Sequence, residues 1–174
     1  MRWDASNKDA WRDGSVIVLR PGGRDVGGGT TAHDMTCNNL RAALHAGLRG
    51  KACRPQGPDL KVKAGRNGRY PDALIDRGPL VPSALVAQEP VAVFEVLSAS
   101  TAWIDQGLKL RDYDATPSIR YYVLISQDER RAMVYTRDAG GLAVGRAERC
   151  SSGGGGGGCR DAGGWGGSAV CGVV

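Results

Sequence analysis

Hydrophobic residues recur with helical spacing in the first third of the chain. Leu40, Leu44 and Leu48 stand four residues apart with alanines between them, which places the three leucines on one face of a helix. The pattern predicts a helix over residues 35–49. Gly50 can end this helix, because glycine readily adopts the backbone conformation that follows a helical C-terminus.

Shorter apolar runs predict strands. Leu60 and Val62 alternate with charged residues, as in a half-buried strand. The run from Val91 to Leu97 is mostly β-branched or apolar, which is typical of a strand buried on both faces. A helix is expected after it, over residues 102–114. Further strands are predicted at residues 16–19, 73–75, 121–125 and 132–135. Strands interleaved with helices indicate an α/β fold.

Composition divides the chain near residue 140. The sequence holds 27 glycines in 174 residues, and eleven of them lie between Cys150 and Val174. Gly153 to Gly158 are six consecutive glycines, whose backbone entropy opposes any packed structure. We therefore predict one domain over residues 15–140, preceded by an irregular N-terminus. A glycine-rich, disordered low-complexity tail is predicted over residues 141–174.

Charge and cysteine content narrow the function classes. The formal net charge is +5, from 23 Lys and Arg against 18 Asp and Glu, which permits nucleic acid as a partner without requiring it. No apolar run approaches the ~20 residues of a membrane span or resembles a signal-peptide core, so we expect a cytoplasmic protein with no membrane partner. The five cysteines form no C-x-x-C pair, which argues against a zinc ribbon.

The candidate chemistry begins with two carboxylates. Glu95 is the one charged residue in the most apolar predicted strand, and Asp72 precedes another predicted strand. A buried carboxylate needs its charge compensated, either by a cationic side chain or by a metal ion. If the two strands are neighbours, the carboxylates can share one site, where a divalent cation relieves their repulsion. Mg²⁺ is the expected ion, with Mn²⁺ as an alternative.

A lysine on the following helix completes this candidate site. Asp105, Lys109 and Tyr113 are spaced by four residues and so share roughly one helical face. Lys109 can then turn toward Glu95 and hold a water molecule, with Asp105 orienting the lysine. Two carboxylates, a metal ion and a lysine are the parts needed for metal-assisted phosphodiester hydrolysis.

Each residue also has a plainer interpretation. Asp72 suits a turn after a proline, Glu95 suits a structural ion pair, and Lys109 suits a solvated helix position paired with Asp105. The three residues together, in this order, favour a site. His33 and His45 show no metal-ligand spacing. His33, near the helix start, can touch the site or a phosphate, and its plainer interpretation is a surface or capping residue.

Four strings between Thr31 and Asp138 resemble the Uma-two family of restriction-endonuclease-like proteins, in the PD-(D/E)XK nuclease superfamily. They are Arg69-Tyr70-Pro71-Asp72, Pro90 to Thr101, Asp105 to Lys109 with Tyr113, and Pro117 to Tyr122. The resemblance implies a restriction-endonuclease-like fold, a central mixed sheet flanked by helices.

The resemblance also implies roles for individual residues. Asp72 and Glu95 would bind the metal ion with the carbonyl of Val96, and Lys109 would act from the helix because Leu97 stands where the superfamily pattern has its lysine. The residues Ser98, Asp105 and Tyr113 would support them. The chain departs from the family in three places. Ser15 stands where members often carry an acid, residues 35–49 contain no acidic residue, and the C-terminal region is the glycine tail.

The expected activity is Mg²⁺-dependent hydrolysis of DNA phosphodiester bonds. Lys61, Lys63 and Arg69 are candidate contacts to the DNA backbone, although a solvated strand face explains them equally well. A homodimer is the candidate assembly. The alternatives are a catalytically inactive DNA- or protein-binding module on the same scaffold, a misread frame whose ends prevent folding, and a glycine-rich RNA-binding protein.

Overall fold

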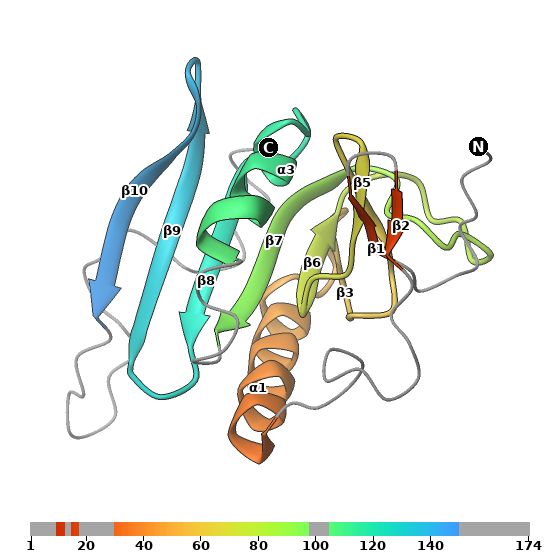
Figure 1. The fold of residues 1–174 in the computed structure, drawn as a ribbon. Coiled ribbons are helices and arrows are strands. Elements are labelled where there is room, and N and C mark those ends of the chain that lie inside the picture. The colour runs from red at the N-terminus through yellow and green to blue at the C-terminus, as the bar shows by residue number, and fades with distance from the viewer. Residues whose placement is uncertain (1–9, 13–14, 18–29, 98–104, 150–174) are drawn as a thin grey trace.

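The computed structural model describes residues 10–12, 15–17, 30–97 and 105–149. Within these residues, a central sheet of six strands has the order β10-β9-β8-β7-β6-β3 (Figure 1). Its strands are β3 (Arg54–Gln56), β6 (Ala73–Asp76), β7 (Pro90–Leu97), β8 (Tyr121–Ser126), β9 (Arg131–Asp138) and β10 (Gly141–Arg149). Strands β7 and β8 are parallel and all other neighbours are antiparallel. The predicted α/β fold with a mixed central sheet is confirmed.

Helices and two small sheets surround the central sheet. The long helix α1 spans Thr31–Gly47, and the π-helical turn η1 (Asp105–Lys109) leads directly into α3 (Leu110–Asp114). The two small sheets pair β1 (Ala10–Arg12) with β2 (Ser15–Ile17), and β4 (Val62–Ala64) with β5 (Asn67–Arg69). Among the described helices, none combines the length and apolar character needed to cross a membrane.

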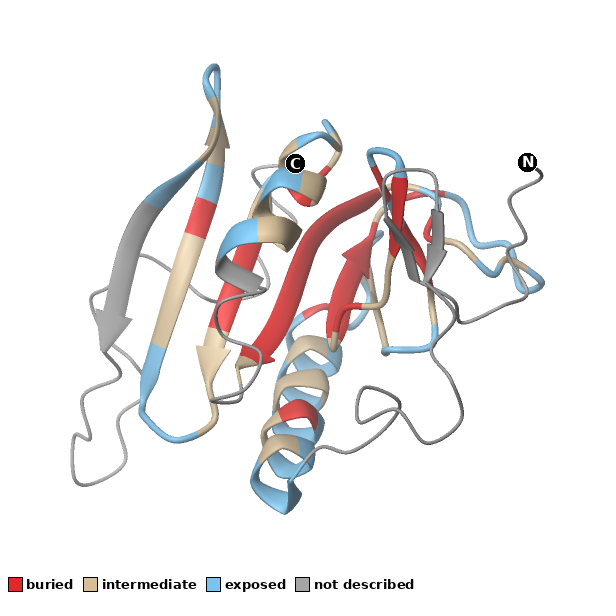
Figure 2. Cartoon of the chain, in the orientation of Figure 1, coloured by how far each residue is buried: buried red, intermediate tan, exposed pale blue. Residues whose placement is uncertain are grey.

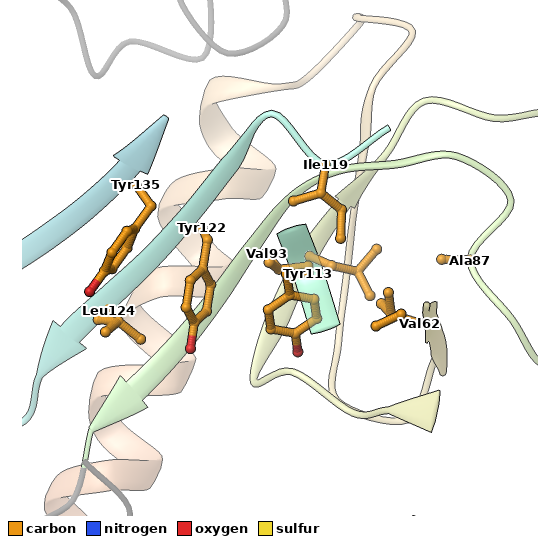
Figure 3. Close-up of a cluster of buried hydrophobic side chains, with 10 residues drawn as sticks. Val62, Ala87, Val93, Tyr113, Ile119, Tyr122, Leu124 and Tyr135 are labelled. Carbon is orange, nitrogen blue, oxygen red and sulfur yellow. The ribbon is translucent and has the colours of Figure 1, made fainter. Parts of the chain in front are cut away.

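Both faces of β7 are buried, as its sequence predicts (Figure 2). On one face, Phe94 belongs to a cluster against which Leu40 and Leu44 of α1 pack. On the other face, Val93 belongs to a cluster with Tyr113 of α3 and Tyr122 of β8 (Figure 3). The alternation of β7 side chains therefore separates the α1 side of the sheet from the α3 side, and the predicted leucine stripe of α1 faces the core.

The predicted end of the domain at residue 140 does not coincide with the end of the central sheet. Strand β10 continues to Arg149 and pairs with β9 along its length. Gly141 adopts a positive φ of 114°, which glycine tolerates and which lets the chain reverse into β10. Strand β10 contains two glycines and three charged residues, and it joins the sheet through backbone pairing with β9. At the other end, β1 occupies part of the segment that was expected to be irregular.

Two further differences concern short strands. The strand expected around Leu60 begins at Val62 and forms a hairpin with β5, with Gly65 in the turn at φ 58°. Strand β3 was not predicted, because its three residues include Pro55. Proline cannot donate a ladder hydrogen bond and is accepted at a sheet edge, which is where β3 lies.

Candidate active site

Asp72 and Glu95 lie on neighbouring parts of the central sheet. Asp72 directly precedes β6, and the first residue of β6, Ala73, pairs with Phe94, the residue before Glu95 on β7. The backbone N–H of Val96 donates a hydrogen bond to Asp72 Oδ2 at 2.7 Å, which ties the Asp72 side chain to β7. The shared site required neighbouring strands, and β6 and β7 are neighbours in the sheet.

Glu95 is buried, with 2% of its surface exposed, and has partners on both carboxylate oxygens. Lys109 Nζ lies 2.9 Å from Oε2, and the Tyr113 hydroxyl donates a hydrogen bond to Oε1 at 2.9 Å. Both partners come from the segment η1–α3, four residues apart, as their spacing predicts. A cationic side chain therefore compensates the charge of Glu95, which is one of the two alternatives that the sequence left open.

Tyr113 is suited to donate this hydrogen bond because it keeps its proton. Burial, and then the negative charge of Glu95, raise the pKa of the Tyr113 hydroxyl well above its usual value. The ring lies 5.0 Å from that of Tyr122, which stacks on Tyr135 with centroids 5.6 Å apart (Figure 3). This aromatic row fixes the Tyr113 ring within the core and directs its hydroxyl to Glu95.

Asp72 is more open than Glu95 and also contacts α1. Its side chain is 23% exposed, and Oδ1 lies 3.4 Å from Nε2 of His33. The backbone carbonyl of Asp72 accepts a hydrogen bond from Arg41 at 3.4 Å. One ring nitrogen of His33, the sulfur of Cys37 and a carboxylate oxygen of Asp72 all lie within 4.8 Å of one another. The sequence left His33 open between contact with the site and a surface or capping role. The cluster with Cys37 was not predicted, although His33 and Cys37 have the four-residue spacing of a shared helical face.

The structure describes the remaining predicted site residues to different extents. Asp105 begins η1, but its side chain is not among those described, and Ser98 lies outside the described residues. The N–H of Val96 is bonded to Asp72, so this residue lies beside the carboxylates. Its carbonyl as a metal ligand stays a prediction.

Of the three predicted DNA contacts, only Lys63 is exposed. Lys61 is completely buried, with Nζ 5.5 Å from the centre of the Tyr70 ring, so it does not lie on the surface predicted for it. Arg69 is bound to the carboxylate of Asp112, with Nε 2.6 Å from Oδ2. The sequence pattern predicted an exposed face for these basic residues. Tertiary packing covers part of that face, because the β4–β5 hairpin folds against α3 through a hydrogen bond from Asn67 to Asp112.

A family comparison identifies most of the chain. Residues 12–149 match the Uma2 family, described as "Putative restriction endonuclease". The chain belongs to the Uma2 family. The match ends at the last residue of β10, so the family region includes the edge strand that sequence analysis had assigned to the tail.

Two relatives extend the comparison. The chain is 26% identical over 146 residues to the uncharacterized protein slr1290 of Synechocystis sp., covering 81% of this chain and 73% of that protein. The fold of this chain is similar to that in the crystal structure of a "putative nuclease belonging to DUF820" from Anabaena variabilis, with a TM-score of 0.57 and 16% identity. That match covers 78% of this chain and 75% of the other. This Uma2 chain therefore has a nuclease-like fold.

Proposed function

We propose that this Uma2 domain hydrolyses DNA phosphodiester bonds with Mg²⁺, or alternatively Mn²⁺, held by Asp72, Glu95 and the carbonyl of Val96. One observation carries the proposal: the Asp72 carboxylate accepts a hydrogen bond from Val96, the residue after Glu95 on β7, and a lysine lies 2.9 Å from the Glu95 carboxylate. Family membership supports the reaction class.

The donor set suits a hard cation. Asp72 and Glu95 supply carboxylate oxygens, the ligand type that Mg²⁺ prefers. Mg²⁺ also retains several of its waters, and the partial exposure of Asp72 gives the site a side open to solvent. When bound, the ion would polarise the phosphoryl oxygen and lower the pKa of a bound water.

The protein's own residues have distinct tasks in this scheme. Lys109 is 20% exposed, so its ammonium lies between the buried Glu95 and the solvent, where it can orient the attacking water or stabilise negative charge on the phosphate. Tyr113 holds Glu95 through its hydroxyl and thereby positions the carboxylate. Ser98 and Asp105 stay predicted supporting residues of this scheme.

DNA contact is proposed for Lys63 alone among the three predicted basic residues. Lys63 is exposed in the centre of β4, and an exposed lysine can neutralise a backbone phosphate. A homodimer and a cytoplasmic location stay predictions.

Cleavage of supercoiled plasmid tests the proposal. Wild-type protein with Mg²⁺ is expected to nick the plasmid, and Asp72→Asn, Glu95→Gln and Lys109→Met should each reduce the rate by about a hundredfold or more. Glu129→Gln is the matched control, because Glu129 is an exposed carboxylate with 68% of its side chain accessible, in the turn between β8 and β9. Cleavage that persists in Glu95→Gln would contradict this assignment.

A second candidate function is an inactive DNA-binding module on the same fold. It is favoured by the complete pairing of Glu95 with Lys109 and Tyr113, which satisfies both carboxylate oxygens without a metal ion. A wild-type protein that binds the plasmid but leaves it intact with both Mg²⁺ and Mn²⁺ would support this function.

A further inference from the structure

The first turns of α1 present two metal-binding side chains toward Asp72. Thr30 caps the helix by accepting a hydrogen bond from the His33 backbone N–H at 3.2 Å, which fixes the turn that carries His33. Cys37 follows one turn later on the same face. A histidine and a cysteine at this spacing can both ligate one ion without any change in the helix backbone.

Asp72 supplies a third ligand from the sheet. The chosen donor atoms of His33, Cys37 and Asp72 lie within 4.8 Å of one another. A tetrahedral ion with ligand bonds of about 2.0–2.3 Å holds its donors roughly 3.3–3.8 Å apart. Closing the remaining distance requires side-chain rotation, and His33 and Asp72 are both only partly buried.

Two observations distinguish this cluster from an ordinary surface contact. The Nδ1 atom of His33 is buried and has no hydrogen-bond partner, which is uncommon for a buried polar atom. Cys37 is 4% exposed and is a free thiol, while His33 and Asp72 are 22% and 23% exposed. The cluster thus has a protected sulfur at its base and a solvent route on the side of His33 and Asp72.

We propose that His33, Cys37 and Asp72 form a binding site for a borderline-soft divalent transition metal of the Zn²⁺ class. Thiolate and imidazole ligands select such metals over Mg²⁺, and three protein ligands leave a fourth position for water. Binding requires that the thiol of Cys37 lose its proton to solvent. Burial raises the pKa of this thiol to about 12 in the metal-free protein, so the metal must displace the proton.

The site also has a consequence that rests on the proposed function. Asp72 belongs both to this cluster and to the proposed Mg²⁺ site, so a Zn²⁺ ion bound to the cluster neutralises part of the negative charge that Mg²⁺ binding needs. Zn²⁺ is therefore expected to inhibit Mg²⁺-dependent cleavage in the wild type. Cys37→Ser should resist this inhibition, when its cleavage with Zn²⁺ is compared with its own cleavage without Zn²⁺.

Cobalt titration tests the site without any cleavage assay. The full-length protein is treated with a chelator and titrated with Co²⁺, which gives a thiolate charge-transfer band when sulfur binds the ion. We expect one Co²⁺ per chain, displaced by Zn²⁺. The band should disappear in Cys37→Ser, and the affinity should fall at least about tenfold in His33→Ala. His45→Ala is the matched control, because His45 is exposed on the last turn of the same helix.

Each outcome separates this site from the proposed nuclease. Glu95→Gln should lose cleavage and keep the cobalt band, so failure of the nuclease proposal leaves the metal site standing. Absence of the band in the wild type, or its persistence in Cys37→Ser, overturns the metal site. His33→Ala, at a partly exposed position, decides the matter if Cys37→Ser fails to fold: unchanged cobalt affinity in that variant also overturns it.

Discussion

At the scale of single residues, the charge of Glu95 governs the candidate site. A carboxylate in the interior of a sheet is costly unless it is paired, and the structure pairs Glu95 with Lys109 and Tyr113. The lysine thus has a structural task in the metal-free protein in addition to the catalytic one that we propose. Stability measurements can separate the two tasks.

Removing the lysine should destabilise the fold. Lys109→Met leaves Glu95 buried without its cation, and loss of one partner of a buried pair costs about 3 kcal/mol. Glu95→Gln combined with Lys109→Met should cost less than the sum of the single changes, because the uncompensated charge is gone. Urea unfolding of the two single variants and the double variant measures this coupling. Additive effects would show that the pair is not energetically linked.

Tyr135 predicts a pH dependence of stability away from the site. Burial raises the pKa of its hydroxyl above the usual value of 10.0. The unfolded state therefore releases this proton at a lower pH than the folded state. The contribution of the neutral hydroxyl to stability is fully present below about pH 10 and is lost as the pH rises through the folded pKa. Tyr135→Phe should lose less stability than the wild type between pH 9 and pH 11, as measured by denaturant unfolding. Equal losses would contradict the prediction.

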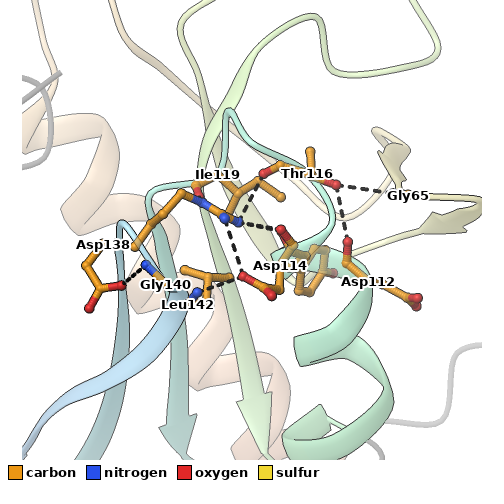
Figure 4. A network of polar contacts seen from close by, with 10 residues as sticks. Gly65, Asp112, Asp114, Thr116, Ile119, Asp138, Gly140 and Leu142 are labelled. Atoms are coloured by element: carbon orange, nitrogen blue, oxygen red, sulfur yellow. Dashed lines mark hydrogen bonds and ion pairs between the residues drawn. The ribbon is translucent and has the colours of Figure 1, made fainter.

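At the scale of elements, one arginine binds the end of the segment η1–α3, which carries Lys109 and Tyr113. Arg137 of β9 donates from Nε to the carbonyl of Ile119 at 2.7 Å and from Nη2 to the carbonyl of Asp114 at 2.8 Å (Figure 4). The Asp114 carboxylate accepts a hydrogen bond from the Leu142 N–H of β10 at 2.7 Å. The C-terminal end of α3 is thereby bound to β9 and β10, and its terminal carbonyls are satisfied.

Replacing this arginine should destabilise the protein even when the charge is kept. Arg137→Lys cannot reproduce the planar set of donors, and we expect a loss of about 2 kcal/mol from unsatisfied carbonyls. The matched control is Arg131→Lys on the same strand, where the arginine side chain is 58% exposed. Urea midpoints of the two variants test this. Equal midpoints would show that the network around α3 carries no stability.

At the scale of the whole molecule, β10 extends the central sheet beyond residue 140. It pairs with β9 from Gly141 opposite Asp138 to Arg149 opposite Arg131. Without β10, strand β9 becomes the sheet edge, and its ladder groups lose their partners. Strand pairing therefore brings residues 141–149 into the sheet.

Two truncated chains test this boundary. A chain ending at residue 140 should be roughly 4 kcal/mol less stable than one ending at residue 149, since it loses one side of a ladder in which each hydrogen bond contributes on the order of 0.5–1 kcal/mol. Comparing their unfolding midpoints isolates β10 from residues 150–174. Identical midpoints would contradict a structural role for this strand.

The sequence by itself determined the elements with strong periodicity. The leucine stripe of α1 and the apolar run of β7 indicate burial through local pattern alone, and the order of Asp72, Glu95 and Lys109 pointed to neighbouring strands and a helix that returns to them. Local spacing carries these features because each depends on residues a few positions apart.

Only the tertiary structure decided which groups meet across long distances in the chain. It buried Lys61, bound Arg69 to Asp112, and brought Asp72 beside His33 and Cys37. It also selected a lysine as the cation beside Glu95 and paired β10 with β9. These outcomes follow from backbone pairing and the packing of distant segments, and no periodicity within one segment encodes the partner that another segment supplies.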